Sequence, residues 1–338
     1  MVRSLGEAGM TSDLYAWFPD VRRELVAAAE ARFAPLELGE GVVVIEEGEE
    51  DVSAMLVCRG EVLVRTGDLE IATVGEGGLI GEIALFGGNL RVATVETVTE
   101  CRFMMLERSD YEVLLHLGSP VAYSLEKRAL RQLAARLREV DSRIAEAGEP
   151  HRLSRDPEAI GSDGPADVDP LRTLVNSRFF EGTPASALVP IAERFVPRVY
   201  APGEMLCRQG AAGDAVYLLV DGAVEVVVSS AGGESGQLAV LEPGDVFGMA
   251  PLLEDRPRMA SCVALEKTTV LRMSRLDGRD LSRLENRTGS SFRTAIIRAL
   301  GDQVAFANAQ LALRHMTRGR LARAGIEAQG QHLYYGRR

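Results

Sequence analysis

Residues 81–95 read GEIALFGGNLRVATV, and the two charged side chains of this stretch, Glu82 and Arg91, lie nine residues apart with glycines between them. A short helical turn beginning at Gly81 leaves backbone N–H groups without intrahelical partners, which favours a bound anion. An arginine on the returning strand can donate two parallel hydrogen bonds to that anion, and an ionised glutamate can accept from a hydroxyl. The stretch predicts a site for a hydroxyl-bearing anion or, alternatively, a structural Arg–Glu pair on a β-domain surface.

The chain contains a duplication, and residues 81–95 lie in its first copy. An offset of 162 residues aligns Phe33 with Phe195, Pro35 with Pro197, Gly41 with Gly203, Gly48 with Gly210 and Gly60 with Gly222. After five extra residues near SSAGGESGQ (229–237), an offset of 167 aligns Gly77 with Gly244, Gly81 with Gly248, Leu85 with Leu252, Arg91 with Arg258 and Ala93 with Ala260. Because the insertion is confined to one turn, the pattern indicates two related domains.

Each copy contains short β-type runs separated by glycines. Runs such as EVLVR (61–65) and AVEVVV (223–228) alternate in polarity, which is typical of half-buried strands. Their close spacing favours a small barrel or jelly roll. The sequence therefore predicts a mainly β fold with α-helices, made of two tandem β-roll, jelly-roll-like domains.

Helices are expected at both ends of each copy. An amphipathic helix comes first, over 20–33 and 184–195, and a long helix comes last, over 120–146 and 289–315. One face of the first long helix carries the residues Leu125, Leu130, Leu133, Leu137 and Val140. We expect this face to pack on its own domain or on a partner helix, which makes a homodimer one expected partner.

The stretch 81–95 resembles the phosphate-binding cassette of cyclic-nucleotide-binding domains, in which Gly-Glu-aliphatic-Ala-Leu is followed, after a short spacer, by Pro-Arg-x-Ala-Ser/Thr-Val. The spacing from Gly81 to Arg91 matches without a gap, and Leu90 stands where the family has proline. The order of helix, β-roll, cassette, two strands and long helix agrees as well. A tandem pair is similar to the regulatory subunits of the cyclic-AMP-dependent kinase, and the bacterial Crp-type sensors share the single domain.

The resemblance implies a role for each matching residue. Glu82 would accept a hydrogen bond from the ribose 2′-hydroxyl, and Arg91 would bind the exocyclic oxygens of the cyclic phosphate. Members that read cyclic GMP tend to carry Thr or Ser after the arginine, so Val92 favours cyclic AMP as the ligand. Backbone N–H groups and a threonine would complete the site, and the full set expected in this copy is Gly81, Glu82, Ile83, Ala84, Arg91, Val92, Ala93 and Thr94.

The second copy departs from the pattern in FGMAPLLEDRPRMASCV (247–263). Met249 stands at the carboxylate position, and Pro251 stands at the alanine position without an N–H to donate. We expect binding at least about tenfold weaker here, or a purely structural domain. Recruitment of a different anion by Arg256 is the alternative. The candidate residues of this copy are Gly248, Arg258, Met259, Ala260 and Ser261.

Composition and motifs exclude several other classes. The net charge is −11 and the pI about 5.1, and only 23 residues follow His315, so direct DNA binding is not expected. None of the four histidines lies in a β-type run, which argues against a metal-dependent cupin, and no hydrolase or P-loop motif occurs. Four spaced cysteines favour free thiols, and without a long apolar stretch we expect a soluble, cytoplasmic protein. Because no catalytic constellation occurs, we do not expect an enzyme.

These observations lead to one interpretation of the chain. Residues 12–146 form the first cyclic-nucleotide-binding domain, 147–168 a linker, 169–316 the degenerate second domain and 317–338 a basic tail. The chain would be a non-enzymatic sensor that binds cyclic AMP through the first domain, with cyclic GMP less favoured and no metal, and relays binding to an unknown effector protein. The alternatives are a structural assembly module without ligands, or a transcription regulator acting through a separate DNA-binding partner.

Overall fold

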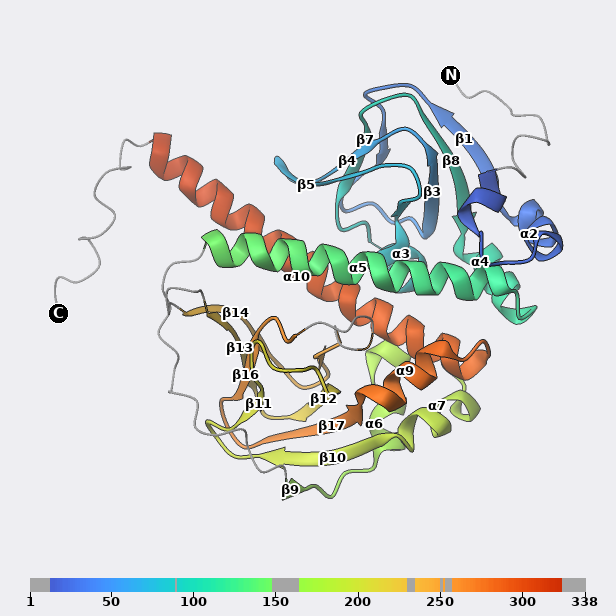
Figure 1. Ribbon diagram of the computed structural model, residues 1–338. Helices are drawn as coiled ribbons and strands as arrows, with labels where there is room; N and C mark the ends of the chain where they lie inside the picture. Colours follow the sequence, from blue (N-terminus) through green and yellow to red (C-terminus); the bar gives the residue numbers. More distant parts are fainter. Residues whose placement is uncertain are drawn as a thin grey trace.

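Two β-rolls lie on either side of a pair of long helices that cross between them (Figure 1). This arrangement is that of a computed structural model, which describes residues 13–88, 90–147, 164–229, 235–249, 252 and 257–323. No helix in these ranges is both long enough and apolar enough to cross a membrane.

The first β-roll consists of two four-stranded antiparallel sheets, with the orders β1-β8-β3-β6 and β2-β7-β4-β5. Strand β4 buries every second side chain, as its alternating sequence predicts. The elements are α2 (Arg23–Ala29), η1 (Glu30–Arg32), β1 (Ala34–Leu38), β2 (Val43–Ile45), β3 (Ser53–Arg59), β4 (Val62–Thr66), β5 (Leu69–Val74), β6 (Leu79–Ile80), α3 (Glu82–Phe86), β7 (Thr94–Thr97), β8 (Cys101–Glu107) and α4 (Arg108–His116).

The second β-roll repeats this topology strand for strand, with the orders β10-β17-β12-β15 and β11-β16-β13-β14. One further strand, β9, pairs with the outer edge of β10. The elements are β9 (Gly164–Pro165), α6 (Pro170–Val175), η2 (Arg178–Phe180), α7 (Ala185–Ala192), β10 (Phe195–Tyr200), β11 (Met205–Cys207), β12 (Ala215–Asp221), β13 (Val224–Ser229), β14 (Ser235–Leu241), β15 (Val246–Phe247), β16 (Ser261–Ala264), β17 (Thr268–Ser274) and α9 (Arg275–Arg283). The repeated topology confirms the predicted pair of jelly-roll-like domains.

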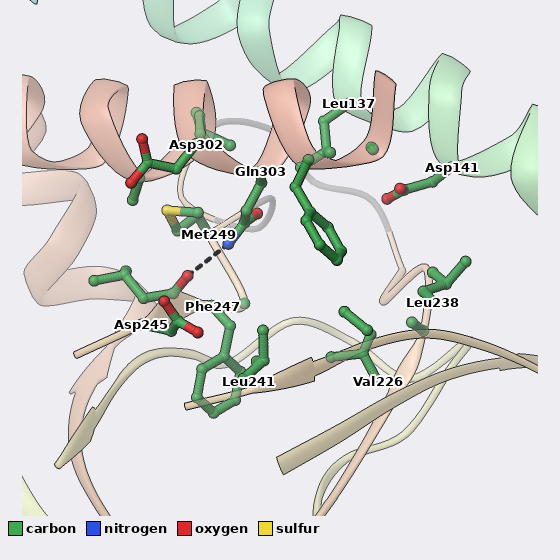
Figure 2. A pocket seen from close by; sticks show the side chains of 18 of the residues that line it. Leu137, Asp141, Val226, Leu238, Leu241, Asp245, Phe247, Met249, Asp302 and Gln303 are labelled. Carbon is green, nitrogen blue, oxygen red and sulfur yellow. Dashed lines mark hydrogen bonds between the residues drawn. The ribbon is translucent and has the colours of Figure 1, made fainter. Parts of the chain in front are cut away.

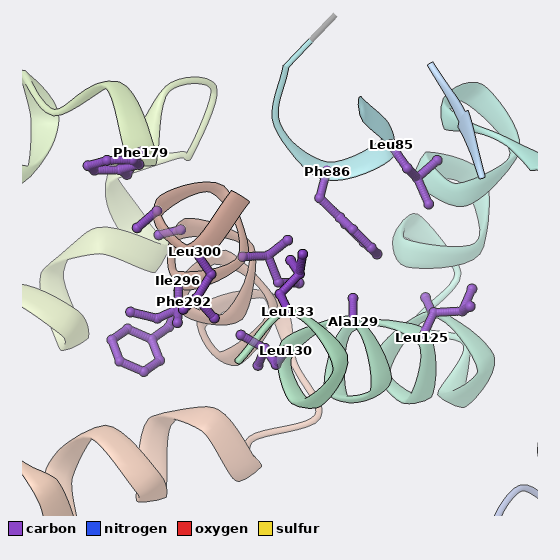
Figure 3. Packing of buried hydrophobic residues seen from close by; sticks show 14 of the residues in the cluster. Leu85, Phe86, Leu125, Ala129, Leu130, Leu133, Phe179, Phe292, Ile296 and Leu300 are labelled. Carbon is purple, nitrogen blue, oxygen red and sulfur yellow. The ribbon is translucent and has the colours of Figure 1, made fainter. Parts of the chain in front are cut away.

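A long helix closes each copy: α5 (Pro120–Ala147) and α10 (Arg287–Arg323). The two helices pack on each other, and their buried side chains join the cassette helix α3 in one hydrophobic core (Figure 3). Leu130 and Leu133 of α5 belong to this core, together with Leu300 of α10 and Phe86 of α3. The apolar face predicted for the first long helix is therefore covered by a helix of the same chain.

Residues of the two long helices that are 167 positions apart also make equivalent contacts. Equivalent side chains donate to equivalent backbone carbonyls of their own β-rolls: Arg143 to Ile71 (2.9 Å) and Gln310 to Leu238 (3.1 Å), Arg136 to Leu79 (3.5 Å) and Gln303 to Val246 (2.6 Å). Each long helix therefore docks on its own β-roll in the same way.

A buried ion pair joins equivalent positions of the two copies. Glu126 of α5 and Arg293 of α10 are related by the same offset, are both 0% exposed, and lie 2.6 Å apart between Oε2 and Nε. The Tyr111 hydroxyl donates to the other carboxylate oxygen at 2.6 Å, and burial raises the pKa of Tyr111. Arg293 also donates to two backbone carbonyls at the end of α9. Both charges are therefore compensated inside the protein.

Two expected boundaries differ from the structure. The boundary at residue 316 falls inside α10, because this helix continues to Arg323 instead of ending near 315. The segment 147–168, expected as a linker, ends with β9, which adds to the sheet of the second β-roll. Residues 148–163 and 324–338, the remainder of the expected linker and tail, lie outside the described residues.

Candidate functional site

The cassette residues of the first copy meet in one small cavity of about 40 Å³. Seven of the eight predicted residues line it, namely Gly81, Glu82, Ile83, Ala84, Arg91, Val92 and Ala93. The eighth, Thr94, is buried beside this cavity, and its hydroxyl accepts from the backbone N–H of Glu47 at 3.1 Å. Leu90, the departure from the cassette pattern, is 54% exposed. The structure thus brings the sequence-predicted set together around one space.

Arg91 is held from two sides and keeps one donor unused. Its Nη2 donates to Asp51 at 2.6 Å, and its Nη1 donates to the backbone carbonyl of Ser53 at 2.8 Å. Although burial raises the pKa of Asp51, the hydrogen bond from Arg91 helps hold that pKa below its usual range. The Nε–H of Arg91 is buried and has no hydrogen-bond partner among the described residues. A fixed guanidinium with a free donor is suited to an anion.

Gly81 is required by the approach of this arginine. Its φ is +76°, and a Cβ placed on it would lie 2.5 Å from Nη1 of Arg91. Gly248 of the second copy has a φ of +73°, and its Cβ would lie 2.7 Å from Nη1 of Arg258. Gly81 and Gly248 therefore each leave room for the arginine of their own cassette.

Glu82 is 1% exposed and binds a residue that the sequence reasoning missed. Arg136 of α5 donates from Nη1 to Oε1 of Glu82 at 2.8 Å. Glu82 and Arg91 are thus not paired with each other, because each has a different ionic partner. Arg136 lies 54 residues from Glu82 in the chain, and only the docking of α5 shows that it reaches the site.

The larger cavity, of about 560 Å³, lies beside the second cassette. Arg258 lines it and is held as Arg91 is, by the backbone carbonyls of Gly248 (2.9 Å) and Ala215 (2.6 Å) and by Asp214 (3.1 Å). Gly248, Met259 and Ala260 also line this cavity, whereas Ser261 accepts from the backbone N–H of Gln209. The second copy therefore retains its arginine holder and has more space around it.

The carboxylate–arginine pair of the first site is replaced in the second. Met249 stands at the position of Glu82 and is 3% exposed. Gln303 stands at the position of Arg136 and donates to the backbone of Val246, as the dashed line in Figure 2 shows. At these two positions the second site thus has neither the carboxylate nor the arginine that pairs with it in the first site. Neither Met249 nor Gln303 carries a charge.

The second cavity is closed on one side by the long helix of the first copy. Leu137 and Asp141 of α5 line it opposite the strand residues Val226 and Leu238 (Figure 2). Burial raises the pKa of Asp141 to about 6. Within the described parts of the chain, no three His, Cys, Asp or Glu side chains lie close enough to hold a metal ion.

We expect Asp141 to give the stability a specific pH dependence. Its unfolded pKa is about 3.9, so between pH 4 and 6 the folded chain binds more protons than the unfolded chain, and this group's contribution to stability falls as the pH rises. Asp141→Asn, which introduces the residue of the equivalent position Asn308, should raise the free energy of unfolding at pH 7 by on the order of 2 kcal/mol and leave it unchanged at pH 4. Urea denaturation at both pH values measures this; an equal effect at both would contradict it.

The repeated β-roll, the cassette glycine and the held arginine define a class of tandem ligand-binding β-roll proteins. The family model for the cyclic nucleotide-binding domain matches residues 35–116 and 197–283, which together make up half of the chain. The chain belongs to the cyclic nucleotide-binding domain family and contains two such domains in tandem.

Individual relatives cover parts of the chain. The cyclic AMP receptor protein of Thermus thermophilus is 36% identical over 104 residues, which span 31% of this chain and 48% of that protein, about half of its length. The regulatory domain of Toxoplasma gondii PKA, solved with cAMP, is 18% identical, with 83% of this chain and 94% of that chain covered at a TM-score of 0.33. The Thermus thermophilus catabolite activator protein is 30% identical, with 44% and 62% covered at a TM-score of 0.28.

Proposed function

We propose that the first domain, residues 12–146, binds cyclic AMP and that the chain is a non-enzymatic sensor. The observation that carries the proposal is the pair of charges in one cavity: the Arg91 guanidinium, with an unused Nε–H, and the buried Glu82 carboxylate. Arg91 would donate to the cyclic phosphate, and Glu82 would accept from the ribose hydroxyl. Val92, which offers no hydroxyl to a guanine amino group, favours adenine.

Binding would be coupled to movement of the long helices. Ligand pockets usually have volumes of about 300 Å³ or more, so a 40 Å³ cavity has to open. Ile83 of α3 lies under Gly301 of α10, where an added Cβ would come within 3.1 Å of Cγ2. Arg298 of α10 donates to the backbone carbonyl of Phe86 at 2.8 Å. Opening the first site would therefore displace α10 and pass the change to the second half and an effector protein.

Calorimetric titration of the full chain with cyclic AMP and with cyclic GMP tests the proposal. We expect saturable heat from cyclic AMP and weaker binding of cyclic GMP. Hydrogen exchange with and without cyclic AMP should change in α3 and in the part of α10 around Arg298. If neither nucleotide gives heat at concentrations of tens of micromolar, the proposed sensor function is wrong.

Arg136→Gln should weaken cyclic AMP binding about tenfold. The substitution gives the first site the residue that the second carries at Gln303, and it removes the cation that orients Glu82 as an acceptor. Arg131→Gln, on an exposed position of the same helix, is the matched control and should leave the affinity unchanged. Titration of both variants measures the difference; equal affinities would show that Arg136 does not support the site.

A further inference from the structure

The second domain combines a held arginine with the larger cavity, and Met249 stands where the first domain has the carboxylate of Glu82. We propose that this cavity binds a small anion carried on an apolar, aromatic or aliphatic body, such as an aryl sulfonate or an amphipathic carboxylate, and not a cyclic nucleotide. The site is distinct from the one proposed for cyclic AMP, and the inference does not depend on it.

The anionic end of the ligand would meet Arg258. This side chain is 5% exposed, and its Nε–H is buried with no hydrogen-bond partner among the described residues. Its counterion, Asp214, is shared, because Arg272 donates to the second oxygen of the same carboxylate at 2.6 Å. Two guanidinium groups thus face one carboxylate, whereas Arg91 has Asp51 as its partner. Because Arg258 shares its counterion, its buried Nε–H is suited to an anion.

The cavity wall selects an apolar body for the ligand. Aliphatic and aromatic side chains line it, among them Val226, Leu238, Leu241, Phe247, Met249 and Phe306. The volume of about 560 Å³ is within the usual range of small-molecule sites. A ribose hydroxyl placed against buried Met249 would lose its hydrogen bond to water without gaining another, which disfavours a nucleotide.

The remaining charges orient the ligand. The other charged residues of the lining are Arg138, Asp141, Arg178, Asp245 and Asp302. Asp245 and Asp302 both pair with Arg178 at 3.2 Å. Here two carboxylates share one guanidinium group, whereas beside Arg258 two guanidinium groups share one carboxylate. An anionic group is therefore attracted to Arg258 and repelled from Asp245 and Asp302. The apolar body would then lie between the strands of the second β-roll and α10.

The probe for this site is 8-anilinonaphthalene-1-sulfonate, an aryl sulfonate whose fluorescence rises on transfer to an apolar site. With the native full-length chain we expect saturable binding at a single site that saturating cyclic AMP does not displace. Arg258→Met should weaken it at least tenfold. Ala305→Trp, which fills the cavity from α10 and keeps Arg258, should do the same if both variants retain the wild-type melting transition.

The matched control is Arg91→Met, which should leave sulfonate binding unchanged and remove cyclic AMP binding. Sulfonate binding unaffected by both Arg258→Met and Ala305→Trp would overturn the inference. Displacement of the sulfonate by cyclic AMP in the Arg91→Met chain would also overturn it, because the second cavity would then be a nucleotide site. Loss of cyclic AMP binding alone would refute only the proposed function of the first domain.

Discussion

We expect the Arg91→Lys variant to bind cyclic AMP about 10- to 100-fold more weakly than the wild-type chain. The arginine uses Nη1 and Nη2 for Ser53 and Asp51, and its Nε–H remains available for the ligand. A lysine ammonium can keep the ion pair with Asp51, but it cannot present a fixed planar set of donors to a phosphate at the same time. Loss of the charge-assisted hydrogen bond from the Nε–H of Arg91, worth about 1.5–3 kcal/mol, accounts for the size of the effect.

Isothermal titration measures the affinity of this variant, and the control is the equivalent substitution in the second domain. Arg258→Lys changes the equivalent residue of the second domain and should leave the heat of cyclic AMP binding unaltered. Both variants should unfold cooperatively, because each lysine retains a carboxylate partner in Asp51 or Asp214. A loss of signal that is equal in the two variants would contradict the assignment of cyclic AMP to the first domain.

The second large effect is expected in the ion pair between the long helices. Arg293→Met should lower the free energy of unfolding by about 3–5 kcal/mol, because Glu126, which is 0% exposed, would lose its cation. Two hydrogen bonds from Arg293 to the backbone carbonyls of Ser282 and Leu284 would be lost as well. Urea denaturation followed by far-ultraviolet circular dichroism measures the change.

A double variant separates the charge effect from a packing effect. Glu126→Gln combined with Arg293→Met removes both charges, so its destabilisation should be smaller than the sum of the two single losses. The Gln side chain can still accept from Tyr111 and Ser290, which donate to Glu126 in the wild-type chain. Additive losses would show that the cost comes from the cavity left by Arg293 instead of from an uncompensated charge.

The features that depend on local sequence patterns could be predicted from the sequence alone. The duplication, the order of the β-rolls and the meeting of Glu82 and Arg91 in one cavity follow from glycine spacing, alternation and the cassette pattern. These features depend on short-range backbone geometry, since Gly81 is needed wherever an arginine approaches as Arg91 does. For the same reason the second copy could be aligned even where its residues differ.

The features that depend on how distant helices dock could not be predicted. Arg136 reaches Glu82 only because α5 lies across the first β-roll, and no local pattern distinguishes it from other arginines of that helix. The difference in cavity size also has a tertiary origin. Gly301 lets α10 approach Ile83 in the first half, whereas Leu137 and Asp141 form one wall of a wider space in the second half. Helix α10 exceeded its expected end because no proline or glycine cap ends the apolar pattern at residue 315.

The ion pair of Glu126 with Arg293 determines which halves could associate if they were separate chains. Packed as the halves of this chain are, two first halves would bring two carboxylates together at this position, and two second halves would bring two guanidinium groups together. Like charges that meet in a buried contact repel, so neither half would pair with itself in this arrangement. Of the three pairings that separate halves could form, only the mixed one would compensate both charges at this position.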